Sequence, residues 1–128
     1  MKTLLKKSVI DMSQVETFTK RNEVIIVAAS GSYVLNMSNG PTYQLNLIGN
    51  TTIVMGTKFP AVNNQSFSFM KVLISFKQDA VGSRTVTWPA SFVWTTPTPP
   101  AISTSPNSVT NVEIITFDGG STWFCRKM

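Results

Sequence analysis

The chain has 128 residues, a formal net charge of +5, 42% hydrophobic residues and only 13% charged residues. Its length is that of one domain, and its shortage of charged residues excludes a long helical or coiled-coil protein, because such chains are rich in Glu, Lys and Arg. Bulk disorder is excluded as well, since the hydrophobic content is too high.

The first 22 residues differ in charge from the rest of the chain. They hold five of the eleven basic residues against two acidic ones, and the spacing of their apolar residues fits either a short helix or an extended arm. No apolar run is long enough to span a membrane or to form a signal peptide, so we expect no membrane insertion. The sequence therefore predicts a basic N-terminal arm over residues 1–22 and a β domain over residues 23–128. The arm residues expected to bind a partner are Lys2, Lys6, Lys7, Lys20 and Arg21.

From Glu23 onward the apolar residues follow the alternation of β-strands, in which every second side chain lies on the same face. Four such runs precede residue 56, at residues 24–27, 33–37, 43–47 and 51–55. Ser30-Gly31 ends the first run, and Asn39-Gly40 separates the second from the third, which predicts a hairpin between them. Gly49-Asn50 predicts another tight turn before the fourth run.

The second half of the chain predicts further strands. They cover residues 67–76, 85–88, 92–94, 109–117 and 122–126. The first of them changes phase near Met70, which indicates a bulge or a strand covered on both faces. Prolines at 97–100 interrupt the pattern, and Asp118–Ser121 is the turn of a final hairpin. About seven to nine short strands at this spacing predict an all-β domain, an antiparallel β-sandwich of jelly-roll type.

Few residues are available for catalysis or metal binding. The chain has no histidine, so it lacks the commonest general base and transition-metal ligand, and its one cysteine, Cys125, cannot form an intrachain disulfide. Asp79 and Asp118 lie in predicted turns, where Asp bonds the local backbone. We therefore expect no catalytic residue, no metal site and no cofactor. The strands carry Ser and Thr rather than interleaved basic and aromatic residues, so no nucleic acid is expected as a partner.

Three tryptophans are the candidates for contact with a sugar or with another subunit. Trp88, Trp94 and Trp123 have rings that stack on pyranose faces, but such rings also fill cores and interfaces. The core or interface role is favoured. Trp94, beside the proline-rich segment, is the one that we expect to be exposed.

The polar strands favour assembly. A small β domain with few charges leaves sheet edges that must be covered or paired, and identical copies in a closed symmetric oligomer provide one way to cover them. The alternative is a monomer whose edges are protected by its prolines and lysines.

Several segments together resemble a module of tailed-bacteriophage virion proteins. A strand that ends in Gln78-Asp79 leads through a Gly-containing turn into Arg84-Thr85-Val86-Thr87-Trp88-Pro89. Phe92-Val93-Trp94, a Pro- and Ser-rich connection at residues 97–105 and an aromatic Asp-Gly hairpin at residues 117–123 follow. With the strands at 43–52, the resemblance covers roughly residues 40–125. It implies a β-sandwich module on the outside of a phage particle, usually in trimeric fibres, spikes or decoration proteins, and it brings no catalytic residues.

These observations lead to one functional hypothesis and one alternative. The chain is expected to be a non-enzymatic virion structural protein, made in the host cytoplasm. It would be a capsid decoration (cement) protein or a short fibre subunit, because no long shaft precedes the module. It would form a homo-oligomer, a trimer, and dock on other capsid or tail proteins through residues 1–22. The alternative is a receptor- or carbohydrate-binding module at a fibre tip, with a host-surface glycan as partner. An enzyme such as a glycan depolymerase is the least favoured class.

We also expect Arg84 to pair with Asp79 across the turn.

Overall fold

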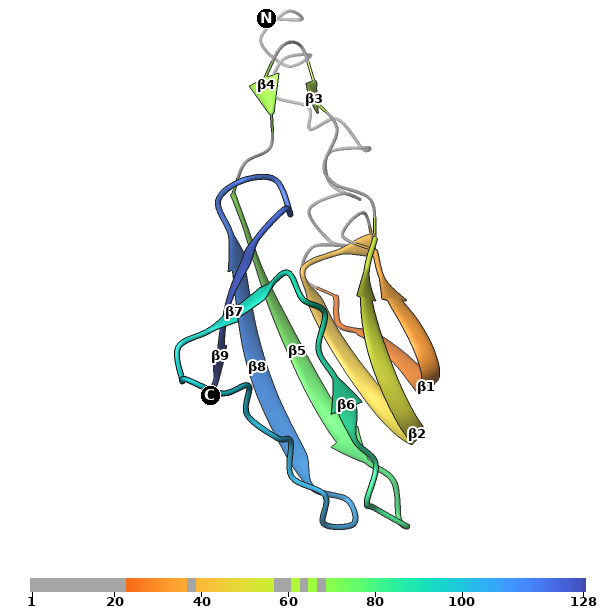
Figure 1. Cartoon of the computed structure of the whole chain (residues 1–128). Helices are drawn as coiled ribbons and strands as arrows, with labels where there is room; N and C mark the ends of the chain where they lie inside the picture. The colour runs from red at the N-terminus through yellow and green to blue at the C-terminus, as the bar shows by residue number, and fades with distance from the viewer. Residues whose placement is uncertain (1–22, 37–38, 57–60, 63–64, 67–68) are drawn as a thin grey trace, which may run out of the picture.

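The computed structural model describes residues 23–36, 39–56, 61–62, 65–66 and 69–128. The basic arm predicted at residues 1–22 lies outside the described residues. The part of the chain that is described contains strands, turns and loops but no α-helix, which confirms the all-β class (Figure 1). None of these residues forms a helix of the length and apolarity needed to cross a bilayer.

Nine strands form in the described residues. They are β1 (Ile25–Leu35), β2 (Thr42–Met55), β3 (Ala61–Val62), β4 (Gln65–Ser66), β5 (Met70–Gln78), β6 (Val86–Thr87), β7 (Phe92–Trp94), β8 (Val109–Thr116) and β9 (Trp123–Lys127). Seven of them form one sheet in the order β1-β2-β5-β8-β9-β7, and β6 joins it by pairing with β2. Strands β3 and β4 pair only with each other.

The sheet is mixed, which differs from the uniformly antiparallel arrangement expected. Strand β2 runs parallel to β1, β5 and β6, and β7 runs parallel to β9. The antiparallel pairs within this sheet are those of β8 with β5 and with β9. The final hairpin, β8 to β9, was predicted from its local turn and is confirmed. The hairpin predicted between residues 33–37 and 43–47 is wrong, because β1 and β2 are parallel neighbours.

The parallel pairing requires that β1 and β2 are strongly bent. Ile25 pairs with Tyr43 and Leu35 pairs with Met55, yet only residues 36–41 connect the two strands. A straight β2 would separate Tyr43 from Met55 by about 40 Å at roughly 3.3 Å per residue. The connection between the strands reaches at most about 25 Å. Figure 1 shows how this is resolved, since each strand reverses its direction near its middle.

The two bends are nested. The register between β1 and β2 shifts next to Gly31, whose φ of 67° suits a residue without Cβ. The bend of β2 lies at the turn predicted for Gly49-Asn50. A Cβ on Gly49 would lie 3.0 Å from Oγ of Ser30, so the two corners are in close contact.

The bends fold one sheet into two layers. The first half of β2 pairs with β5 through residues 42–47, whereas Thr51 and Thr52 in its second half pair with β6. The segment from β6 to β7 then crosses over β5 and β8 to reach β9 (Figure 1). Strands that change layer through bends are a known way to close a sandwich around a core.

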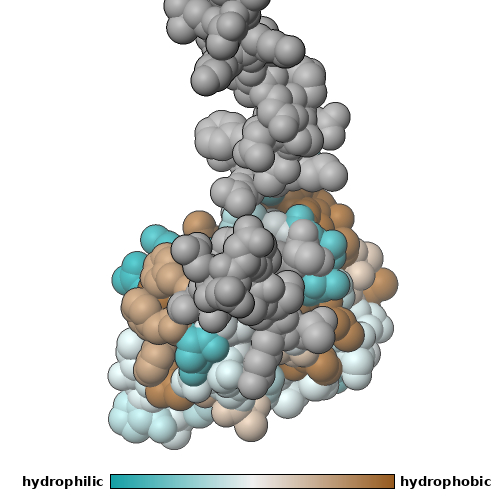
Figure 2. Space-filling model, turned by 90° about the horizontal axis from the view of Figure 1, so that it is seen from above, coloured by the Kyte–Doolittle hydropathy of each residue, from teal (hydrophilic) through white to brown (hydrophobic). Residues whose placement is uncertain are grey.

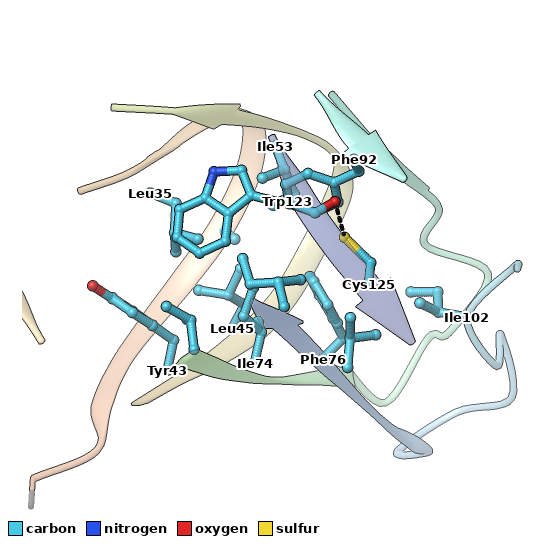
Figure 3. Close-up of a cluster of buried hydrophobic side chains, with 14 of the residues drawn as sticks. Leu35, Tyr43, Leu45, Ile53, Ile74, Phe76, Phe92, Ile102, Trp123 and Cys125 are labelled. Atoms are coloured by element: carbon cyan, nitrogen blue, oxygen red, sulfur yellow. Dashed lines mark hydrogen bonds between the residues drawn. The ribbon is translucent and has the colours of Figure 1, made fainter. Parts of the chain in front are cut away.

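The core lies between these layers. Alternate residues of β2 and β5 point inward, as predicted from the sequence, and Trp123 and Cys125 of β9 join them (Figure 3). The buried hydrophobic residues are Ala29, Leu35, Tyr43, Leu45, Leu47, Ile53, Val72, Ile74, Phe76, Phe92, Ile102, Val112, Ile114, Trp123 and Cys125. The bulge predicted near Met70 is wrong, because the pairing of β5 with β8 runs without a register shift from Met70 to Lys77. Phe69 is exposed and Val72 is buried because they lie on opposite faces of one regular alternation.

Candidate interaction surfaces

The three tryptophans predicted as contact residues lie in or against the core. Trp123 is buried, and Trp88 and Trp94 are half-buried with their ring centroids 4.8 Å apart. The indole Nε1 of Trp88 donates a hydrogen bond to the carbonyl oxygen of Pro100 at 3.1 Å. Trp94 is therefore less exposed than expected, because it packs against Trp88 and Phe92.

The outer face of β5, β8 and β9 carries an exposed cluster of phenylalanines, which we call the phenylalanine face. It consists of Phe69, Phe117 and Phe124, with ring centroids 5.3 Å apart for Phe69 and Phe117 and 6.2 Å apart for Phe117 and Phe124. Phe124 pairs across the sheet with Ile115 on one side and Val93 on the other. The sequence alone did not single out these three phenylalanines as a surface cluster.

An ion triad lies beside the phenylalanine face. The carboxylate of Glu113 is bonded by Nε of Arg126 at 2.9 Å and lies 3.1 Å from Nζ of Lys71. These two cations hold the pKa of Glu113 below its usual range, Arg126 contributing most. The side chain of Glu113 is only 7% exposed, and the two cations of its own chain balance its charge.

Exposed hydrophobic residues also lie on the outer sides of both layers that β1 and β2 form, and we call this set the aliphatic face. Its exposed hydrophobic residues are Val24, Ile26, Val34, Ile48 and Val54. Figure 2 shows hydrophobic residues on two flanks of the body, one on the side of β8 and β9 and the other on the side of β1 and β2.

A pair of locked loops, residues 79–84 and 103–108, forms one end of the domain. The backbone N–H of Ser83 donates to the carbonyl oxygen of Thr104 at 2.7 Å, and that of Asn107 donates to the carbonyl oxygen of Asp79 at 3.0 Å. The predicted pair of Arg84 and Asp79 is confirmed, with Nη2 2.9 Å from Oδ2. Most of the exposed residues in these loops are Ser, Thr or Asn.

No group of three or more acidic or cysteine side chains suited to a metal ion occurs among the described residues. Cys125 is buried, and burial raises the pKa of its thiol to about 12. Its Sγ lies 3.4 Å from the carbonyl oxygen of Trp123, as drawn in Figure 3. This environment is that of a packing residue rather than a nucleophile.

Comparison with known proteins gives one match. Residues 27–122 match the family model described as "Putative phage tail fibre C-terminal domain". No curated protein and no solved structure gives a significant match to the chain. The matched range covers most of the chain and includes every strand of the seven-stranded sheet, in whole or in part, except β9, which begins at residue 123. The resemblance to tailed-phage virion surface proteins is thereby confirmed, and the chain belongs to the family of phage tail fibre C-terminal domains.

Proposed function

We propose that this chain is a non-enzymatic subunit of a short tail fibre that associates with copies of itself and attaches to the phage particle through residues 1–22. The family match carries the proposal. It begins at residue 27 and so coincides with the β domain, while the concentration of basic residues precedes it. That start of the match supports a division between a folded body and a basic attachment segment.

Two exposed apolar faces support self-association. Large apolar patches on a soluble domain mark contact surfaces, and this domain carries both the phenylalanine face and the aliphatic face. Phenylalanine, valine and isoleucine offer no polar group to a sugar, so these faces suit protein partners.

The location on the particle is tested by immunoelectron microscopy of intact virions with an antibody against the β domain. Label at the tail is the expected result. Label distributed over the head would contradict the tail-fibre proposal and favour a capsid decoration protein.

The attachment role is tested with phage whose chain lacks residues 2–22. We expect the shortened chain to fold but to be missing from purified particles. A matched variant keeps the length and replaces Lys2, Lys6, Lys7, Lys20 and Arg21 by Gln. Its loss from particles would show that charge is responsible, whereas normal incorporation of the shortened chain would contradict attachment through this segment.

A second candidate function is receptor binding at a fibre tip. The observation in its favour is the exposed polar end formed by the two locked loops, because hydroxyl and amide side chains on a fixed backbone suit a glycan. A glycan array compares the wild type with the Thr104→Ala variant, which removes an exposed hydroxyl group of that end. Binding that the variant loses would support this function, and no binding by the wild type would remove it.

The non-enzymatic character is tested separately. Host-surface polysaccharide is incubated with the purified chain, and its chain length is followed by size-exclusion chromatography. An unchanged length is expected, and progressive shortening would contradict the proposal.

A further inference from the structure

The two bent strands β1 and β2 lie in the longest stretch of the chain without charge. Residues 24–56 contain no Lys, Arg, Asp or Glu, although the whole chain carries eleven basic and six acidic residues. Ordinary soluble domains have charged side chains at about a quarter of their positions. The aliphatic face is therefore both apolar and free of charge.

Strand β1 is also an edge of the sheet. It stands at one end of the strand order and pairs with β2 on one side, and no other described strand pairs with it. Edge strands usually carry Lys or Pro, or are very short, which prevents pairing with another chain. β1 has 11 residues, in two limbs on either side of the corner at Gly31, and neither limb contains Lys or Pro. Ile26 in the first limb is 59% exposed, and Val34 in the second is 54% exposed.

The opposite edge of the sheet has the protection that β1 lacks. Strand β7 has only three residues, and Pro89 and Pro97 lie shortly before and after it. Proline lacks the N–H that a new neighbouring strand would need. The difference singles out β1 as the edge that is open to pairing.

Charge indicates which partner covers this surface. Two copies of a chain with net charge +5 repel each other least where they meet without charges. The phenylalanine face is less suitable for such a contact, because Lys71, Lys77 and Arg126 on that side of the sheet outnumber the single carboxylate of Glu113. An acidic partner would be drawn to those cations rather than to the uncharged strands.

We propose that a second copy of this chain covers the free edge of β1, where Ile26 and Val34 are exposed. The inference rests on the proposed self-association and assigns it to one surface. Main-chain hydrogen bonds along the edge and burial of Ile26 and Val34 both contribute to the contact.

The test measures the mass of the purified full chain by light scattering after size-exclusion chromatography, over a hundredfold range of concentration. One variant combines Ile26→Lys and Val34→Lys. The control combines Phe117→Lys and Phe124→Lys, which adds the same charge to exposed apolar positions of the phenylalanine face. Thermal unfolding confirms that each variant is folded, and the milder Ala28→Lys change, also at an exposed position of β1, replaces the first variant if it is not.

The expected result is an oligomer for the wild type and for the control, and a monomer for the β1 variant. Hydrogen exchange then provides a second measurement: amides of residues 24–35 should exchange at least tenfold more slowly in the oligomer than in the monomeric variant. If the control variant became monomeric and the β1 variant stayed oligomeric, the inference would be overturned, although self-association itself would stand. Dissociation of both would also overturn it, because added charge alone would then suffice. A wild type that stays monomeric at every concentration would instead refute self-association itself.

Discussion

The side chain of Gln78 and the backbone of Arg84 exchange two hydrogen bonds. Nε2 of Gln78 donates to the carbonyl oxygen of Arg84 at 2.7 Å, and the N–H of Arg84 donates to Oε1 of Gln78 at 3.0 Å. The same Nε2 also donates to the carbonyl oxygen of Ser103 at 2.9 Å. A single buried amide, 2% exposed, thus connects both locked loops to the end of β5.

Replacing Gln78 by Ala should destabilise the domain by about 2–4 kcal/mol, because backbone groups that it satisfies lose their partners in a buried place. Urea unfolding followed by tryptophan fluorescence measures the change. Gln44→Ala is the control, since Gln44 is half-buried and bonds only the neighbouring side chain of Asn46. Equal losses in the two variants would contradict the linking role of Gln78.

Two glycines with positive φ should respond differently to substitution by Ala. Gly82 has a φ of 73°, and a Cβ there would lie 2.7 Å from the carbonyl oxygen of Thr104, whereas Gly31 has a φ of 67° and open space around it. Gly31→Ala should cost about 1 kcal/mol from the left-handed backbone alone. Gly82→Ala should cost about 1–3 kcal/mol more, because the two loops must separate. Similar melting temperatures for the two variants would show that the loops are less tightly joined.

Acid should destabilise the domain through carboxylates with lowered pKa. Hydrogen bonds from the N–H of Thr122, from other groups of the turn and from Thr116 lower the pKa of Asp118, and Arg126 and Lys71 lower that of Glu113. Such groups stabilise the fold fully above their unfolded pKa values, 3.8 for Asp118 and 4.5 for Glu113, and the contribution is lost as the pH falls through the lower folded values. The melting temperature should therefore be steady from pH 7 to pH 6 and fall below about pH 4.

The variant Asp118→Asn checks this origin. Asn keeps an oxygen that accepts from the N–H groups of Ser121 and Thr122, which Oδ1 of Asp118 binds at 3.0 and 2.9 Å. It has no carboxyl group to protonate, so its melting temperature should fall less between pH 6 and pH 3 than that of the wild type. An identical fall would assign the acid sensitivity to other groups.

Cys125 should be inert in the folded protein. With its pKa raised to about 12 by burial, almost no thiolate exists at pH 8. A colorimetric thiol reagent should react within minutes in 6 M guanidinium chloride and at least a hundredfold more slowly without denaturant. Rapid reaction of the native protein would show that β9 opens readily.

The core and the local turns followed from the sequence because they depend on neighbouring residues. Alternation predicted which side chains of β2, β5 and β8 point inward, and the short step from Asp79 to Arg84 across a glycine turn predicted their ion pair. The direction of β1 relative to β2 could not be predicted from the sequence. A turn sequence such as Asn39-Gly40 favours a hairpin, but the earlier corner at Gly31 had already reversed β1, and no local pattern reports that reversal.

The candidate surfaces were predictable only in part. The parity of Phe117 and Phe124 places them on the outer face of their strands, but their contact depends on the pairing of β8 with β9. The three tryptophans were candidate contact residues because of their residue type alone, whereas in the structure their large rings pack in or against the core. The uncharged stretch at residues 24–56 was visible in the sequence, and its meaning depends on β1 being an edge.

The nested corners of β1 and β2 couple the evolution of the two strands. Ser30 and Gly49 touch where the strands reverse, and the ladders on both sides of that point are fixed by the same contact. A residue added to one limb alone would shift every later pair by one position and turn inward-facing side chains toward solvent. Length changes in this half of the domain therefore have to arise as matched insertions or deletions in both strands, which makes it far less tolerant of loop grafting than the opposite, proline-bordered edge.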